Sequence, residues 1–97
     1  MEDIVRLNEI DQDVLLALLN KDKLGIRELE EEIKKVSKQR SPNAITKSVD
    51  KLLKMGLVKE EKEEKPPRGK RLIYLTDKGK EVAKHLKSIY ELIGKSG

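Results

Sequence analysis

The sequence contains no cysteine, phenylalanine or tryptophan, and it has a single histidine, His85. Without cysteine, the chain can form neither a disulfide nor a thiolate metal site. One histidine gives too few ligands for a histidine-based metal site within one chain. The hydrophobic core is therefore expected to be aliphatic, and no metal or other cofactor is expected.

Long apolar runs are also missing, and this absence bears on location. No stretch approaches the roughly 20 apolar residues that a membrane span needs. The start, Met1-Glu2-Asp3, lacks the basic and apolar regions of a secretory signal. We therefore expect a cytoplasmic protein without a membrane partner.

No combination of nucleophile, base and orienting group is evident in the sequence, so an enzyme is not expected. The carboxylates of residues 59–64 (KEEKEE) alternate along an expected strand and have no second acidic cluster to converge with.

Charged residues make up 41% of the 97 residues, and their signs are unevenly distributed. Residues 1–32 contain 4 Lys or Arg and 10 Asp or Glu, a net charge of −6, whereas residues 33–97 contain 18 and 8, a net of +10. The second part is therefore the candidate surface for a polyanion. The excess of Lys and Glu also matches the composition of heat-adapted proteins, so a thermophilic source is a hypothesis.

The length indicates one compact domain, and apolar spacing predicts its elements. Asn8 and the Ser41-Pro42 pair are typical helix starts, and Gly56 is typical of a left-handed helix end. Residues 21–25 are expected to form a turn. We expect helices over residues 9–20, 26–37, 42–55 and 77–94, and a β-hairpin over residues 57–75.

This order of elements predicts a mainly α protein with a small β-hairpin, a winged helix-turn-helix. In that arrangement the helix over residues 42–55 enters the DNA major groove and the hairpin is the wing. Double-stranded DNA is therefore the expected partner.

The expected DNA-binding side chains lie on or beside the predicted recognition helix. Asn43, Thr46 and Lys47 are the candidates for reading base edges, by pairing with adenine, thymine and guanine respectively. Phosphate contacts are expected from the basic residues around them: Lys38, Arg40, Lys51 and Lys54. The wing adds the basic residues Arg68, Lys70 and Arg71 for the backbone or a narrow minor groove.

The run from Ala44 to Val58 (AITKSVDKLLKMGLV), the basic hairpin and the Leu75-Thr76-Asp77-Lys78-Gly79 segment together resemble MarR-type regulators. PadR-like and small archaeal winged-helix regulators share much of this pattern. The resemblance covers about the second half of the chain and implies a dimer with Thr46 and Lys47 at the groove. The chain departs from MarR-type proteins in lacking their long N-terminal dimerisation helix. The connection from Val36 to Ser41 is also several residues longer than a tight helix-turn-helix turn.

The last predicted helix is expected to dimerise the protein, because its apolar residues extend further than a thin core needs. The expected interface residues are Val82, Leu86, Ile89, Tyr90 and Ile93. We expect a homodimeric transcriptional regulator, with repression favoured because no separate activating domain is evident. A protein-interaction module and an architectural DNA binder without sequence preference are the alternatives. A small-molecule effector is neither indicated nor excluded.

Overall fold

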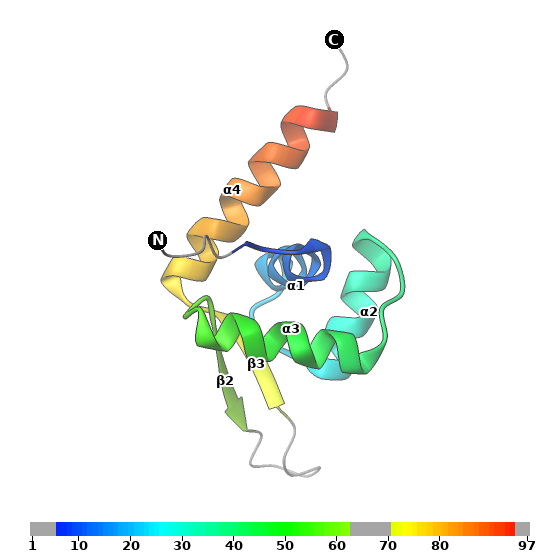
Figure 1. Ribbon diagram of the computed structural model, residues 1–97, viewed down its shortest axis with the longest axis vertical. Helices are drawn as coiled ribbons and strands as arrows, with labels where there is room; N and C mark the ends of the chain where they lie inside the picture. The colour runs from blue at the N-terminus through cyan, green and yellow to red at the C-terminus, as the bar shows by residue number, and fades with distance from the viewer. Residues whose placement is uncertain (1–5, 63–70, 95–97) are drawn as a thin grey trace.

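The computed structural model describes residues 6–62 and 71–94 of the chain. Its elements follow in the order α1 (Glu9–Asn20), β1 (Leu24–Gly25), α2 (Ile26–Val36), α3 (Pro42–Lys54), β2 (Val58–Lys62), β3 (Arg71–Leu75) and α4 (Asp77–Gly94). Figure 1 shows α1 end-on at the centre, α3 crossing beside it, and α4 projecting away from the rest of the molecule. The mainly α winged-helix fold expected from the sequence is confirmed.

The helix starts at α1 and α3 are fixed by side-chain caps. The Asn8 Oδ1 accepts from the Asp11 N–H at 2.9 Å, and the Asp11 Oδ2 accepts from the Asn8 N–H at 3.0 Å. At α3 the Ser41 Oγ accepts from the Ala44 N–H at 3.2 Å, and Pro42 takes the first helical position. These caps satisfy N–H groups that a helix start otherwise leaves unpaired.

The end of α3 is set by Gly56, which has a φ of 75°. The Leu57 N–H donates to the Leu52 carbonyl at 3.0 Å and the Gly56 N–H donates to the Leu53 carbonyl at 3.1 Å, the paired bonds of a glycine helix end. Predicted helices over residues 26–37 and 42–55 each end one residue earlier in the structure. The turn at Gly56 leads the chain directly into β2.

The sheet has three antiparallel strands in the order β1-β3-β2. β3 pairs with β2 from Val58 opposite Leu75 to Lys62 opposite Arg71, and with β1 through Leu24 opposite Ile73. The turn expected over residues 21–25 is therefore wrong at its end, because Leu24 and Gly25 form a strand. Two residues are too few to show the alternation by which a strand is recognised in a sequence.

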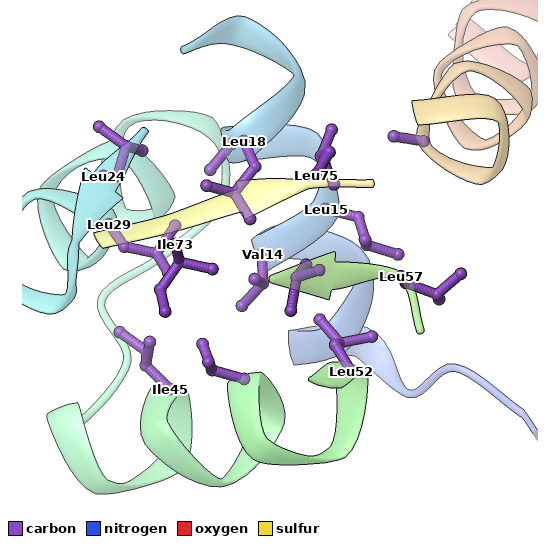
Figure 2. Close-up of a cluster of buried hydrophobic side chains, with 14 of the residues drawn as sticks. Val14, Leu15, Leu18, Leu24, Leu29, Ile45, Leu52, Leu57, Ile73 and Leu75 are labelled. Carbon is purple, nitrogen blue, oxygen red and sulfur yellow. The ribbon is translucent and has the colours of Figure 1, made fainter. Parts of the chain in front are cut away.

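The core lies where α1, α2, α3 and the sheet meet, and Figure 2 shows their side chains pointing into one interior. Val14 and Leu15 of α1, Leu29 of α2, Ile45 of α3 and Ile73 of β3 are all fully buried. The predicted apolar stripes of these helices therefore form the shared aliphatic core. This core holds α3 with one face inward and the other outward.

Candidate nucleic-acid interface

The outward face of α3 is polar and lies opposite its buried stripe. Ile45, Val49 and Leu52 are fully buried, whereas Asn43, Lys47, Asp50 and Lys54 are exposed. Thr46 is half-buried, and its Oγ1 donates to the Pro42 carbonyl at 2.9 Å. The hydroxyl can still accept a hydrogen bond, and the methyl group of Thr46 remains available for apolar contact.

Three of the predicted contact residues on α3 have no polar partner within the part of the chain that the structure describes. Among residues 6–62 and 71–94, neither Lys47 nor Lys54 forms an ion pair, and the Asn43 side chain forms no hydrogen bond. These side chains carry donors that are not occupied internally. They can bind base edges or phosphates without first breaking an intramolecular bond.

Lys51 differs from Lys47, although it lies only one helical turn further along α3. Its Nζ donates to the Asp11 Oδ2 at 2.6 Å and to the Arg6 carbonyl at 2.9 Å. The Ser48 Oγ donates to the other carboxylate oxygen of Asp11, also at 2.6 Å. Lys51 and Ser48 therefore join α3 to the start of α1.

Asp11 is fully buried at the centre of this cluster. Burial pushes the pKa of Asp11 upward, but the hydrogen bonds from Lys51, Ser48 and the Asn8 backbone outweigh it, so the pKa lies below its ordinary value. The carboxylate is therefore charged at neutral pH and matched by the Lys51 ammonium. This buried group joins α3 to α1.

Arg40 is held in a similar way in the connection before α3. Its Nη2 donates to the Glu9 Oε1 at 2.6 Å and to the Asp13 Oδ2 at 3.1 Å, and its side chain is only 17% exposed. Burial lowers the pKa of Arg40, but the two carboxylates raise it by more than burial lowers it. The pKa of Arg40 therefore lies above its ordinary value. Lys38 lies nearby, exposed, with its Nζ 3.8 Å from Glu9. The long connection over residues 37–41 is therefore anchored to α1.

Arg71 at the start of β3 connects the wing to α3. Its Nε donates to the Glu60 Oε2 at 2.5 Å, and its Nη2 donates to the Asp50 Oδ1 at 3.1 Å. These carboxylates raise the pKa of Arg71. The wing and α3 are thus linked by one guanidinium. The predicted wing residues Arg68 and Lys70 lie outside the described residues.

The carboxylates that pair with these cations were not singled out from the sequence. Asp11 could have been found, because Asn8 and Asp11 have the spacing of a reciprocal helix cap. Glu9, Asp13 and Glu60 gave no comparable signal, since their partners lie at least eleven residues away along the chain. The charge asymmetry of the sequence was interpreted only as a candidate surface for a polyanion, and it did not indicate which cations would be paired internally.

The helix α4 changes character along its length. Val82 and Leu86 pack on the core, and Ala83 is fully buried. Further on, Ile89, Tyr90, Leu92 and Ile93 are 49%, 47%, 69% and 70% exposed. The Tyr90 hydroxyl bonds to the Gln12 side chain of α1. Tyr90 and Val36 of α2 line a groove of about 310 Å³. The distal half of α4 therefore presents an apolar surface.

No three His, Asp or Glu side chains in the described ranges are grouped as a metal site requires. Among the helices of the same ranges, none is long and apolar enough to cross a membrane.

Comparison with known proteins places this arrangement in a family. The family model described as ArnR1-like, winged-helix domain matches residues 4–93. The chain belongs to the ArnR1-like winged-helix family. The resemblance to winged-helix regulators inferred from the sequence is thereby confirmed. No curated protein matches the chain.

Solved structures similar to this ArnR1-like domain include winged-helix transcription regulators. A ZitR variant from Lactococcus lactis has a TM-score of 0.75 and 26% identity over 96% of this chain, which spans 59% of the ZitR chain. A MarR-family regulator from Silicibacter pomeroyi has a TM-score of 0.72 and 27% identity, covering 84% of this chain and 51% of its own. A PadR-family regulator from Clostridium difficile has a TM-score of 0.75 and 16% identity, covering 89% and 91% respectively. The PadR likeness concerns the fold alone.

Proposed function

We propose that this ArnR1-like domain is a homodimeric transcriptional regulator that binds double-stranded DNA at specific sequences, with α3 in the major groove. The observation that carries the proposal is the set of donors on the exposed face of α3 that have no partner within residues 6–62 and 71–94. Asn43 and Lys47 supply donors for base edges, and Lys54 supplies charge for phosphate. Membership of a winged-helix family with regulator neighbours supports the same role.

The paired cations have a different part in this proposal. Lys51 and Arg40 position α3 and the connection before it, and their charges are already matched by carboxylates on α1. Lys38 remains a candidate for phosphate contact because it is exposed and its ion pair with Glu9 is long. Affinity therefore depends on fewer cations than the sequence alone suggested. Arg68 and Lys70 of the wing stay predicted backbone contacts.

The dimer is proposed to form through the distal half of α4. The exposed side chains of Ile89, Tyr90, Leu92 and Ile93 supply an apolar surface that a two-fold related copy can cover. Two recognition helices would then address half-sites about 34 Å apart on near-palindromic DNA. A dimer bound over two successive major grooves blocks access to the duplex, which favours repression.

The test is selection from a random duplex library at two salt concentrations, followed by sequencing of the bound fraction. We expect a palindromic motif and an affinity that falls steeply with salt. Salt-sensitive binding without a motif would instead support an architectural DNA binder. Absence of DNA binding would support a protein-interaction module.

A matched pair of variants connects the result to α3. The Thr46→Ala, Lys47→Ala double variant should lose most of its affinity for the selected site. The control is Lys84→Ala, which removes the same charge from an exposed position of α4. Equal affinities of the parent and a folded double variant would contradict the proposed role of α3.

A further inference from the structure

Asp50 is an acidic residue in the middle of the exposed face of α3. Its side chain is 54% exposed, Lys47 precedes it by three residues, and Lys54 follows it by four. Residues at these spacings lie along one face of a helix. A carboxylate on a face that approaches phosphates weakens binding to every sequence alike. Its place among the lysines therefore needs a physical reason.

The Asp50 carboxylate is oriented by the wing. Its Oδ1 accepts from the Arg71 Nη2 at 3.1 Å, while the Arg71 Nε is bound to Glu60. Within the part of the chain that the structure describes, the Asp50 Oδ2 accepts no hydrogen bond. The group is thus held through one oxygen, and the second oxygen, on a side chain that is 54% exposed, can accept another hydrogen bond. Partial neutralisation by Arg71 also lowers its repulsion of phosphates.

We propose that Asp50 is a specificity-determining residue that accepts a hydrogen bond from the N4 amino group of a cytosine in the major groove. This inference rests on the proposed DNA-binding function. An ionised carboxylate only accepts hydrogen bonds. Guanine presents only acceptors in the major groove, and thymine presents an acceptor and a methyl group, so both are disfavoured beside it. Cytosine offers the N4 donor that a carboxylate needs, whereas adenine presents its N6 donor beside the N7 acceptor, which repels a carboxylate.

Lys47 favours guanine, which is the base that pairs with this cytosine. Its ammonium donates only, and guanine presents the O6 and N7 acceptors. A C·G pair therefore offers a donor for Asp50 on one base and acceptors for Lys47 on the other. Because the rise between Lys47 and Asp50 along the helix is about 4.5 Å, close to one base-pair step, the two side chains address the same or adjacent pairs. The i, i+3 pair is complementary to a C·G-containing step.

The alternative role of Asp50 is to hold Arg71, and thereby the wing, in position through its hydrogen bond to the guanidinium. The structure supplies a control for this role, because Glu60 is the other carboxylate on the same guanidinium. Glu60→Gln weakens the brace and leaves the face of α3 unchanged. Asp50→Asn is isosteric and exposed, so folding is expected to persist. It replaces an acceptor with an amide, whose preferred base is adenine.

The experiment is library selection with the parent, Asp50→Asn and Glu60→Gln, each checked for folding by its thermal melting. We expect the parent to select C at one position of each half-site and Asp50→Asn to shift that position toward A. The parent should prefer C there on the order of ten-fold over T. Glu60→Gln should keep the parent motif.

The remaining outcomes overturn the inference in distinguishable ways. If the parent has a motif that Asp50→Asn leaves unchanged, Asp50 reads no base, although the proposed function stands. If Glu60→Gln alters the motif as Asp50→Asn does, both residues act through Arg71 and the wing. If the parent selects no motif at all, the proposed sequence-specific function fails and base reading by Asp50 fails with it.

Discussion

At the scale of single residues, Gly79 sets how α4 begins. A Cβ at this position would lie 1.8 Å from the Leu57 carbonyl oxygen, and the Thr76 N–H donates to that same oxygen at 3.0 Å. The clashing atom belongs to the backbone, which cannot relieve the clash by changing rotamer as a side chain can. From the sequence alone, Gly79 could equally be a glycine that close packing requires or one that is merely tolerated. The two could not be distinguished because Leu57 lies far from Gly79 along the chain.

We therefore expect Gly79→Ala to lower the free energy of unfolding by about 3 kcal/mol. The control is Gly94→Ala in the same helix, where an added Cβ meets no atom within 4 Å. That change should be neutral or stabilise by up to about 1 kcal/mol, because alanine favours helix more than glycine does. Urea unfolding midpoints of the two variants provide the measurement, and equal midpoints would contradict the packing role of Gly79.

Asp11 predicts how stability depends on pH. Its folded pKa is lowered, so the stability it contributes is fully present above its unfolded pKa of about 4 and is lost as the pH falls through the folded value. Asp11→Asn should cost about 2 kcal/mol at neutral pH, because Lys51 loses its charged partner. The melting temperatures of parent and variant should converge as the pH falls below about 4. Asp22→Asn, at an exposed position, is the control, and a difference that persists at pH 2 would refute the account.

At the scale of elements, α3 contains two lysines, one helical turn apart, that differ in their polar partners. Lys47 has no internal partner in the described ranges, whereas Lys51 is bound to Asp11. Their sequence contexts do not distinguish them, since both lie at polar positions of one amphipathic helix. The difference depends on α1, and only the folded arrangement brings Asp11 to Lys51.

This difference predicts that one lysine variant changes the salt dependence of DNA binding and the other changes the stability of the fold. Lys47→Ala should reduce the slope of log affinity against log salt by about one for each chain bound, with little change in melting temperature. Lys51→Ala should lower stability by about 2 kcal/mol, since Asp11 stays buried without its cation. Binding titrations at several salt concentrations and thermal melts check both. The assignment is wrong if Lys51→Ala changes the salt slope while leaving stability intact.

The helices and the β2–β3 pairing were predictable because their signals are local. Apolar spacing, the Ser41-Pro42 start and Gly56 each lie within or beside the element that they define. The strand β1 was missed because its two residues acquire their structure only by pairing with β3. In the same way, the candidate contact residues were predictable by type and position. Which of them were already occupied depended on carboxylates from other elements.

At the scale of the whole molecule, the charge asymmetry of the sequence has two consequences. Part of the basic excess after residue 32 is matched internally, because α1 supplies Glu9, Asp11 and Asp13 to Arg40 and Lys51. Two further basic residues, Lys47 and Lys54, lie on exposed positions of α3 and form no ion pair within residues 6–62 and 71–94. The acidic N-terminal part therefore positions the basic surface and limits the charge left for nonspecific binding to DNA.

The projection of α4 from the molecule, visible in Figure 1, leads to the prediction about assembly. Ile93 is 70% exposed near the end of that helix, and a carboxylate there would be costly to bury in an apolar interface. Ile93→Glu should therefore convert a dimer to a monomer in sedimentation equilibrium. Lys84→Gln lowers the net charge by the same amount at an exposed position on the opposite side of α4 and should remain dimeric.

The monomeric variant also tests how assembly serves DNA binding. In a dimer, binding of one half-site places the second recognition helix at a high effective concentration beside the other half-site. Ile93→Glu should therefore bind a full palindrome little better than a single half-site. The parent and Lys84→Gln should bind the palindrome at least ten-fold more tightly, on the order expected for linked sites. A parent protein that sediments as a monomer would exclude α4 as the dimerisation element. A parent that dimerises equally well with Ile93→Glu would place the interface elsewhere on the molecule.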